Sequence, residues 1–167
     1  VFASMENPPK LSSQPNFPQL EEDVLARWKE QKIFEKTLEA TKNGKHFVFF
    51  EGPPTANGKP GIHHVLARAF KDVIPRFKTM QGYHVPRRWG WDCHGLPVEN
   101  EVEKELGFKS RKDIENYGVE KFNARAREAV MRHADDWRRI IPRMGRWADM
   151  DNDYRTMDAS YTESVWW

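Results

Sequence analysis

Two loops rich in glycine and proline carry the residues of this sequence that are best suited to bind a ligand. The first loop, EGPPTANGKPG, follows an apolar run at 47–50 and ends at His63 and His64. In α/β proteins a loop at the end of a strand binds ligands, and a helix that begins there presents unpaired N–H groups to an anion. Gly58 and Gly61 let a ligand approach the backbone, and imidazoles can donate to phosphate oxygens. An isolated histidine pair at a helix start is more often solvated or structural.

The second loop, GWDCHGLPVE at 90–99, follows a predicted strand at 83–89. Asp92, at the end of that strand, could bind an ammonium group, or it could only cap the next turn; we favour binding. His94 and Glu99 are weaker candidates, and Glu99 could simply begin the following helix. If the two strands are parallel neighbours, the two loops lie side by side and bring Asp92 and His94 near the histidine pair.

The elements around these loops predict an α/β fold. Helical spacing of apolar residues predicts a helix at 19–41, and the unbroken apolar run at 47–50 predicts a central strand buried on both faces. A second helix at 64–80 and a strand at 83–89 complete a right-handed parallel unit. We therefore expect the first half of a Rossmann-like nucleotide-binding domain, with parallel strands and flanking helices, preceded by an N-terminal helix.

Beyond the second loop the sequence predicts mainly helices. A short helix is expected at 98–106, Ser110 is expected to cap the next helix, and amphipathic spacing predicts a long helix at 119–141. Residues 1–18 are rich in Pro, Ser and Asn and predict a flexible tail. We assign 19–167 to one domain, and the aromatic pair at the end of the chain suggests that this domain continues beyond it.

Composition narrows the class of protein. The 167 residues include a single cysteine, Cys93, which rules out an intrachain disulfide and fits a reducing compartment. Structural zinc sites take four ligands, usually with cysteines in close pairs, so we expect neither zinc nor another metal site in this chain. Mean hydropathy is −0.85 and no apolar run approaches the roughly 20 residues of a membrane span, so we expect a soluble, cytoplasmic protein without a membrane partner.

The charge balance gives little support to nucleic acid as the main partner. The formal net charge is +2, which is too small to indicate a strongly basic surface. We expect the Arg87–Arg88 pair and the arginine-rich stretch at 124–146 to form solvated faces rather than a track for RNA.

Five of the seven tryptophans divide into two groups, and the other two are the pair at the chain end. Trp28, Trp137 and Trp147 lie in or beside helical patterns, and we expect them in the core. Trp89 and Trp91 flank the second loop, where either could form the wall of a substrate pocket.

Three familiar nucleotide signatures are absent: G-x-x-x-x-G-K-[ST], G-x-G-x-x-G and the kinase set. The combination that is present, EGPPTANGKP followed by GIHH, the Lys71–Asp72 pair and GWDCHGLPVE, resembles the class I aminoacyl-tRNA synthetases. The form GWD-x-HGLP-x-E is similar to that of their isoleucyl members, and the resemblance runs from about Glu21 to the chain end. The usual signature of the class is His-x-Gly-His, whereas residues 61–64 read GIHH, with the first His and the Gly exchanged.

The resemblance implies adenylate formation, in which the carboxylate of isoleucine attacks the α-phosphate of ATP, Mg²⁺ accompanies the ATP and pyrophosphate leaves. The isoleucyl group then passes to tRNA(Ile). By resemblance His63 and His64 are the catalytic donors, and these two with Gly58 and Gly61 bind ATP. His63 holds the place where the glycine of the family leaves room for adenine. Our hypothesis is that the exchanged motif remains catalytic, because both imidazoles survive.

The resemblance also implies that Asp92 and the carbonyl of Pro53 bind the ammonium of the amino acid, with Asn57, His94 and Glu99 as weaker candidates. Relatives of this type are usually monomers. The Lys-Met-Ser-Lys-Ser loop, the editing site and the anticodon-binding helices of the family are not found here, so we expect the chain alone to be weakly active or inactive. Two hypotheses stay open: the catalytic N-terminal part of an isoleucyl enzyme, or a non-catalytic fragment that binds adenine nucleotide or a protein partner.

Overall fold

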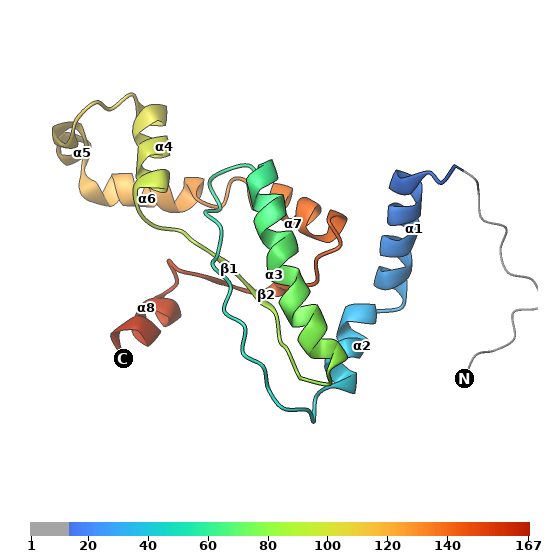
Figure 1. Ribbon diagram of the computed structural model, residues 1–167. Helices are drawn as coiled ribbons and strands as arrows, with labels where there is room; N and C mark the ends of the chain where they lie inside the picture. Colours follow the sequence, from blue (N-terminus) through green and yellow to red (C-terminus); the bar gives the residue numbers. More distant parts are fainter. Residues whose placement is uncertain (1–13) are drawn as a thin grey trace, which may run out of the picture.

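A computed structural model describes residues 14–167 (Figure 1), so most of the predicted flexible tail lies outside the described residues. Helices α1 and α2 lie at one end of the molecule, α4, α5 and α6 at the other, and α3, α7 and both strands between them. No helix within 14–167 has the length and hydropathy that a membrane crossing requires. The elements are α1 Phe17–Glu30, α2 Ile33–Ala40, α3 Ile62–Met80, β1 Arg88–Trp91, α4 Leu96–Leu106, α5 Arg111–Tyr117, α6 Val119–Ala129, α7 Ala134–Arg143, β2 Asp149–Arg155 and α8 Ala159–Trp166.

The N-terminal helical region consists of two helices, so the prediction of one helix at 19–41 is wrong. α1 begins earlier than predicted, at Phe17, because Oδ1 of Asn16 accepts the N–H of Gln19 at 3.4 Å and caps the helix. Between α1 and α2 the backbone of Lys32 is left-handed, with φ 50°. A right-handed helix cannot pass through that conformation, and α2 therefore starts afresh.

The two strands β1 and β2 form a parallel sheet, with Arg88 opposite Asp149 and Gly90 opposite Tyr154. A Cβ atom on Gly90 would lie 2.2 Å from Cζ of Tyr154, so only glycine leaves room for the tyrosine ring. β1 lies nearer the C-terminus than the strand predicted at 83–89. The sequence does not predict β2, because DMDNDYR is polar and lacks the alternation of a half-buried strand.

The segment at 47–50 has no regular secondary structure, so it is not the buried central strand that its apolar residues predict. Parallel pairing with the chain before the second loop occurs only as isolated bridges, one of which joins Thr55 to Asp92. The side chains of Val48 and Phe50 are 67% and 89% exposed in the described part of the chain. The predicted direction of pairing is therefore confirmed, whereas the predicted burial is wrong.

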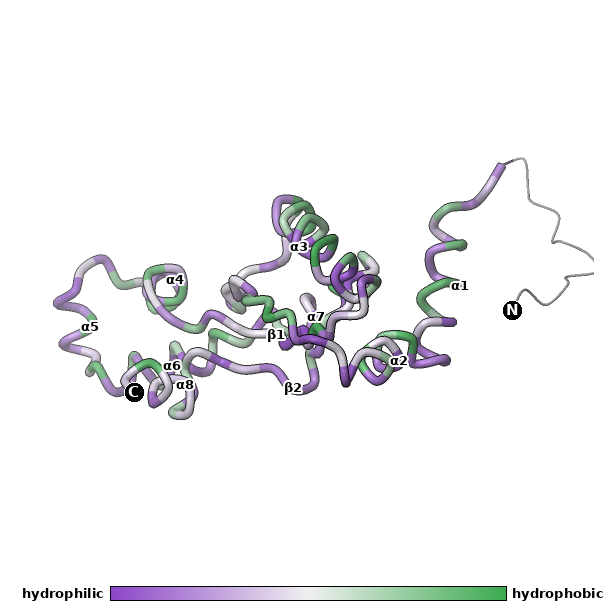
Figure 2. Tube along the Cα trace, turned by 60° about the horizontal axis from the view of Figure 1, so that its bottom comes forward, coloured by the Kyte–Doolittle hydropathy of each residue, from purple (hydrophilic) through white to green (hydrophobic). Residues whose placement is uncertain are grey.

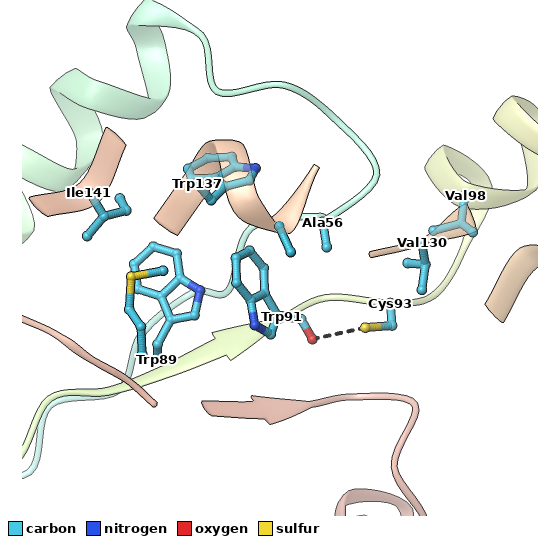
Figure 3. Packing of buried hydrophobic residues seen from close by; sticks show 10 residues of the cluster. Ala56, Trp89, Trp91, Cys93, Val98, Val130, Trp137 and Ile141 are labelled. Carbon is cyan, nitrogen blue, oxygen red and sulfur yellow. Dashed lines mark hydrogen bonds between the residues drawn. The ribbon is translucent and has the colours of Figure 1, made fainter. Parts of the chain in front are cut away.

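Three tryptophans, Trp89, Trp91 and Trp137, form the centre of the core (Figure 3), with exposures of 0%, 0% and 1%. The core position predicted for Trp137 is confirmed. Trp89 and Trp91 were candidates for a pocket wall, and that interpretation is wrong because neither reaches a surface. Trp28 and Trp147 are partly buried and pack edge to face with ring centroids 5.2 Å apart. The remaining members of the cluster are Ala56, Cys93, Val98, Val130, Ala134, Ile141 and Met150.

The long helix predicted at 119–141 is interrupted by a turn at 130–133, which separates α6 from α7. The backbone N–H of His133, at the start of α7, donates to the carbonyl oxygen of Ala56 at 3.3 Å. In a continuous helix that N–H would bond within the helix, so the interruption makes it available to the first loop. Helix α4 and the cap of α5 at Ser110 agree with the predictions.

Helix α3 has two faces of opposite character. One side of α3 faces away from the rest of the chain (Figure 2). The inner face buries Arg68, which is 4% exposed, together with Pro75. Helices usually bury their apolar face, and α3 buries a polar one. The opposite, outer face is apolar and exposed. Each of its residues is between 49% and 83% exposed: Ile62, Leu66, Phe70, Val73 and Phe77.

Candidate active site at the start of helix α3

The first loop lies against the end of β1, where the second loop begins. The backbone N–H of Asp92 donates to the carbonyl oxygen of Pro54 at 2.9 Å, and the N–H of Ala56 donates to the carbonyl oxygen of Asp92 at 3.4 Å. These bonds confirm that the two loops lie side by side. The backbone of Asp92 is thereby fixed relative to the segment that leads to the histidine pair.

Helices α4 and α7 hold the first loop from the other side. Nε1 of Trp137 donates to the carbonyl oxygen of Gly58 at 2.9 Å. Nδ2 of Asn57 donates to the carbonyl oxygen of Pro97 at 2.8 Å and to Oε2 of Glu101 at 2.9 Å. Asn57, a weaker candidate for ligand binding, is only 8% exposed, and these bonds use its amide to join the loop to α4.

The imidazole of His64 is held in one orientation. Its Nδ1 accepts the backbone N–H of Gly61 at 2.9 Å, and its ring meets the ring of Trp137 edge to face at a centroid distance of 4.9 Å. Partial burial lowers the pKa of His64, and its electrostatic interactions with His63 and Arg68 lower it further. A nitrogen that accepts a hydrogen bond carries no proton, so His64 is neutral with its proton on Nε2.

The ring of His63 lies against that of His64, with centroids 3.9 Å apart, and its side chain is exposed. A Cβ atom on Gly61 would lie 3.0 Å from Cε1 of His63, so Gly61 leaves just enough room for this ring. Around Gly58 there is nothing within 4 Å of such a Cβ position. The backbone of Gly58 is therefore open to a ligand, as a nucleotide site requires.

The side chains of the second loop make local contacts. Oδ1 of Asp92 accepts the N–H of His94 at a long 3.4 Å, which is the capping arrangement that we considered beside ligand binding. Nε2 of His94 lies 2.9 Å from the carbonyl oxygen of Thr156, to which it can only donate. Glu99 lies in the first turn of α4, as expected. Within residues 14–167 no hydrogen bond joins Asp92 or His94 to the histidine pair; the backbone alone brings the loops together.

A buried ion network is centred on Glu51, the first residue of the first loop. Glu51 contacts Arg146, and both side chains are 5% exposed; Nζ of Lys71 lies 3.1 Å from the Glu51 carboxylate. The expectation that Arg87 and Arg146 belong to solvated faces is wrong, because they are 6% and 7% exposed. Burial lowers the pKa of Arg87 to about 10. Sequence reasoning missed Glu51, since nothing in its pattern shows that it pairs with an arginine 95 positions away.

Pro53 faces a different space from the histidines. It lines a groove of about 770 Å³ together with Phe50, Arg88, Tyr154 and Tyr161. Within residues 14–167 there is no group of three His, Cys, Asp or Glu side chains that could hold a metal ion. The donors suited to a nucleotide are thus the open backbone of Gly58, the start of α3 and the Nε2 proton of His64.

Comparison with known proteins gives a consistent assignment. A sequence profile described as tRNA synthetases class I (I, L, M and V) matches residues 23–167. Isoleucine--tRNA ligase of Thermobifida fusca is 60% identical over 159 residues, which are 95% of this chain and 15% of that protein. The protein of the same name from Thermus thermophilus is 53% identical over 158 residues, with 95% and 15% covered. The chain thus spans about 15% of the length of these relatives.

A solved structure supports the fold. It is the LeuRS of Agrobacterium radiobacter K84, crystallised as a ternary complex with tRNA and LeuAMS. The TM-score is 0.58 at 24% identity, and the match covers 89% of this chain and 16% of that one. Since the profile covers nearly all of the described residues, the chain belongs to the family of class I tRNA synthetases.

Proposed function

We propose that the protein that contains this chain activates isoleucine with ATP to isoleucyl-adenylate and transfers the isoleucyl group to tRNA(Ile). The chain supplies the histidine loop and the site for the amino acid ammonium. Support for isoleucine comes from the relatives of 53–60% identity, which are named isoleucine--tRNA ligases. Because the chain spans about 15% of their length, the residues that read the side chain and the tRNA lie largely in other parts of such proteins.

The observation that carries the proposal is the fixed orientation of His64 at the start of α3, where Nδ1 accepts the N–H of Gly61. When the carboxylate of isoleucine attacks the α-phosphate, negative charge builds up on the phosphoryl oxygens. The Nε2 proton of His64 can donate to one of these oxygens without first being reoriented, which is the preorganisation that lowers a barrier. His63, whose ring lies against that of His64, is the second donor, and Mg²⁺ arrives with ATP as part of the substrate.

Asp92 and the carbonyl of Pro53 are the proposed partners of the amino acid ammonium. The capping bond to Asp92 is long and uses only Oδ1, so the carboxylate can accept a charged donor that binds it more strongly. The backbone bonds to Pro54 and Ala56 keep the carboxylate at the junction of the two loops.

Isoleucine differs from valine by one methylene, which is worth only about 1–3 kcal/mol in a hydrophobic pocket. The activation test therefore has to include valine. Pyrophosphate exchange with ATP would be measured on the full-length protein with isoleucine, valine, leucine and methionine in parallel. We expect exchange that is highest with isoleucine.

The control for this experiment is Asp92→Ala, which removes the carboxylate and leaves the backbone bonds in place. We expect it to raise the KM for isoleucine by at least tenfold, since a charge-assisted hydrogen bond contributes about 1.5–3 kcal/mol. A folded full-length protein that shows no exchange with any amino acid would favour the binding-only alternative.

A further inference from the structure

Trp137 makes two contacts with the proposed active-site segment and one with Arg68 of α3, although it belongs to α7 and lies 73 positions beyond His64. Its Nε1 donates to the carbonyl oxygen of Gly58 at 2.9 Å. Its ring meets the His64 ring at 4.9 Å and 68°, and Cζ of Arg68 lies 4.8 Å from the indole centroid. One buried side chain thus contacts both ends of the segment from Gly58 to His64.

The segment that Trp137 holds would otherwise have few constraints. Between Gly58 and His64 the chain contains Lys59, which is exposed, and Pro60 and Gly61, which are only partly buried. Gly58 is open on its ligand side. The indole N–H and the indole ring therefore act on different points of a short loop whose other surface is free to meet a ligand.

Trp89 provides a comparison within the same core. It is 0% exposed, its centroid lies 6.3 Å from that of Trp137, and both belong to one cluster (Figure 3). Its Nε1 is buried and has no hydrogen-bond partner in the described part of the chain. Both indoles fill the core, but only the N–H of Trp137 is bonded to the loop.

We infer that Trp137 is a positioning residue of the active site: its N–H fixes Gly58 and its ring contact fixes the ring of His64, so that the Nε2 proton is presented to the phosphate of ATP. This inference rests on the proposed function. It assigns to a core tryptophan of α7 a part in the orientation of the histidine loop. The chemistry itself remains with the histidines.

The test compares Trp137→Phe with Trp89→Phe in the full-length protein. Each change removes the same atoms from the same core, but only Trp137→Phe removes a hydrogen bond to the loop. In pyrophosphate exchange we expect Trp137→Phe to lower kcat/KM for ATP by about five- to tenfold, the loss of one hydrogen bond in the transition state. We expect the KM for isoleucine to stay the same, and Trp89→Phe to stay within about twofold of wild type.

Hydrogen exchange of the peptide at 54–64 provides a readout that does not depend on activity. We expect faster exchange of this peptide in Trp137→Phe and wild-type exchange in Trp89→Phe, since only the first change frees Gly58. If the wild-type protein shows no pyrophosphate exchange but the loop responds in this way, the proposed function fails and the positioning of the loop stands.

Two results would overturn the inference. One is equal behaviour of the two variants in both kcat/KM for ATP and loop exchange. The other is an unfolding midpoint of Trp137→Phe more than about 5 °C below that of Trp89→Phe, because the bond would then stabilise the fold as a whole rather than the loop.

Discussion

The two faces of α3 differ in what they contribute to the molecule. The inner face carries His64, Arg68 and Lys71, and each of these side chains contacts another segment: Trp137 of α7, the tryptophan core and Glu51. The outer face carries an apolar stripe that is exposed in the described residues. Charge and hydrogen bonding therefore decide how α3 sits on this part of the chain, and the same contacts position the candidate site.

The inner face of α3 is held by charged side chains, and substitution of these side chains should be costly. Cζ of Arg68 lies 5.6 Å from the centroid of Trp89, and Cζ of Arg76 lies 3.9 Å from that of Trp147, so cation–π contacts replace part of the usual apolar packing. Burial lowers the pKa of Arg68, and the nearby carboxylate of Glu51 opposes that effect. A buried cation needs its partner, which makes the inner face the place where a single substitution costs most.

The largest effect is expected for Glu51→Gln. It leaves Arg146 buried without its carboxylate, and breaking a buried pair in this way typically costs about 3–5 kcal/mol. The matched change is Glu115→Gln, which removes one partner of the exposed ion pair with Arg111 and should leave stability unchanged. Thermal unfolding of both full-length variants measures the difference. Equal unfolding midpoints of the two variants would mean that the ion network around Glu51 does not stabilise the packing of the inner face of α3.

The second effect concerns catalysis. His64→Ala removes an inner-face donor, and loss of one preorganised donor typically costs about 3 kcal/mol, so we expect the rate of pyrophosphate exchange to fall roughly a hundredfold. Ile62→Ala, two residues away on the outer face, is the control and should retain wild-type exchange because this side chain is 83% exposed. A similar loss in both variants would assign the effect to the helix start rather than to the imidazole.

Much of this arrangement follows from the sequence, and its loops follow best. The order of strand, glycine-rich loop and helix places Asp92 beside the first loop, and the backbone bonds to Pro54 and Ala56 agree. Local signals also predict α4 and the Ser110 cap. These features depend on neighbours in the chain or on the fixed geometry of parallel strands, which periodicity and turn chemistry can predict.

The errors arise where distant contacts override local pattern. The turn at 130–133 interrupts an amphipathic run, and His133 uses it to bond Ala56, 77 positions earlier. Arg146 is polar by type yet buried, because Glu51 lies opposite to it in the fold. Residues at 47–50 are apolar by type, yet Val48 and Phe50 are exposed and the other two are only partly buried. In each case, burial of the side chain depends on whether a distant segment of the described chain packs against it. A short stretch of sequence around the residue does not contain that information.

The smallest and most specific effect is a pH dependence of stability and of catalysis, which arises from His64 on the inner face. Burial, His63 and Arg68 lower the pKa of His64 below its ordinary value near 6.5. The unfolded chain therefore takes up the proton first. This site adds no pH dependence to stability well above pH 6.5, and it destabilises the fold as the pH falls through 6.5.

Catalysis should follow the protonation of the folded form. A proton on Nδ1 of His64 would remove the acceptor of the Gly61 N–H, so kcat/KM for ATP should decline on the acid side with a midpoint below 6.5. The measurement is the pH profile of pyrophosphate exchange in wild type, Ile62→Ala and His64→Ala. Ionisation of ATP contributes equally to the profiles of all three proteins, so the part of the decline that belongs to His64 should be present in the first two and missing from the third. An acid decline as large in His64→Ala as in wild type would separate the pH response from the inner face of α3.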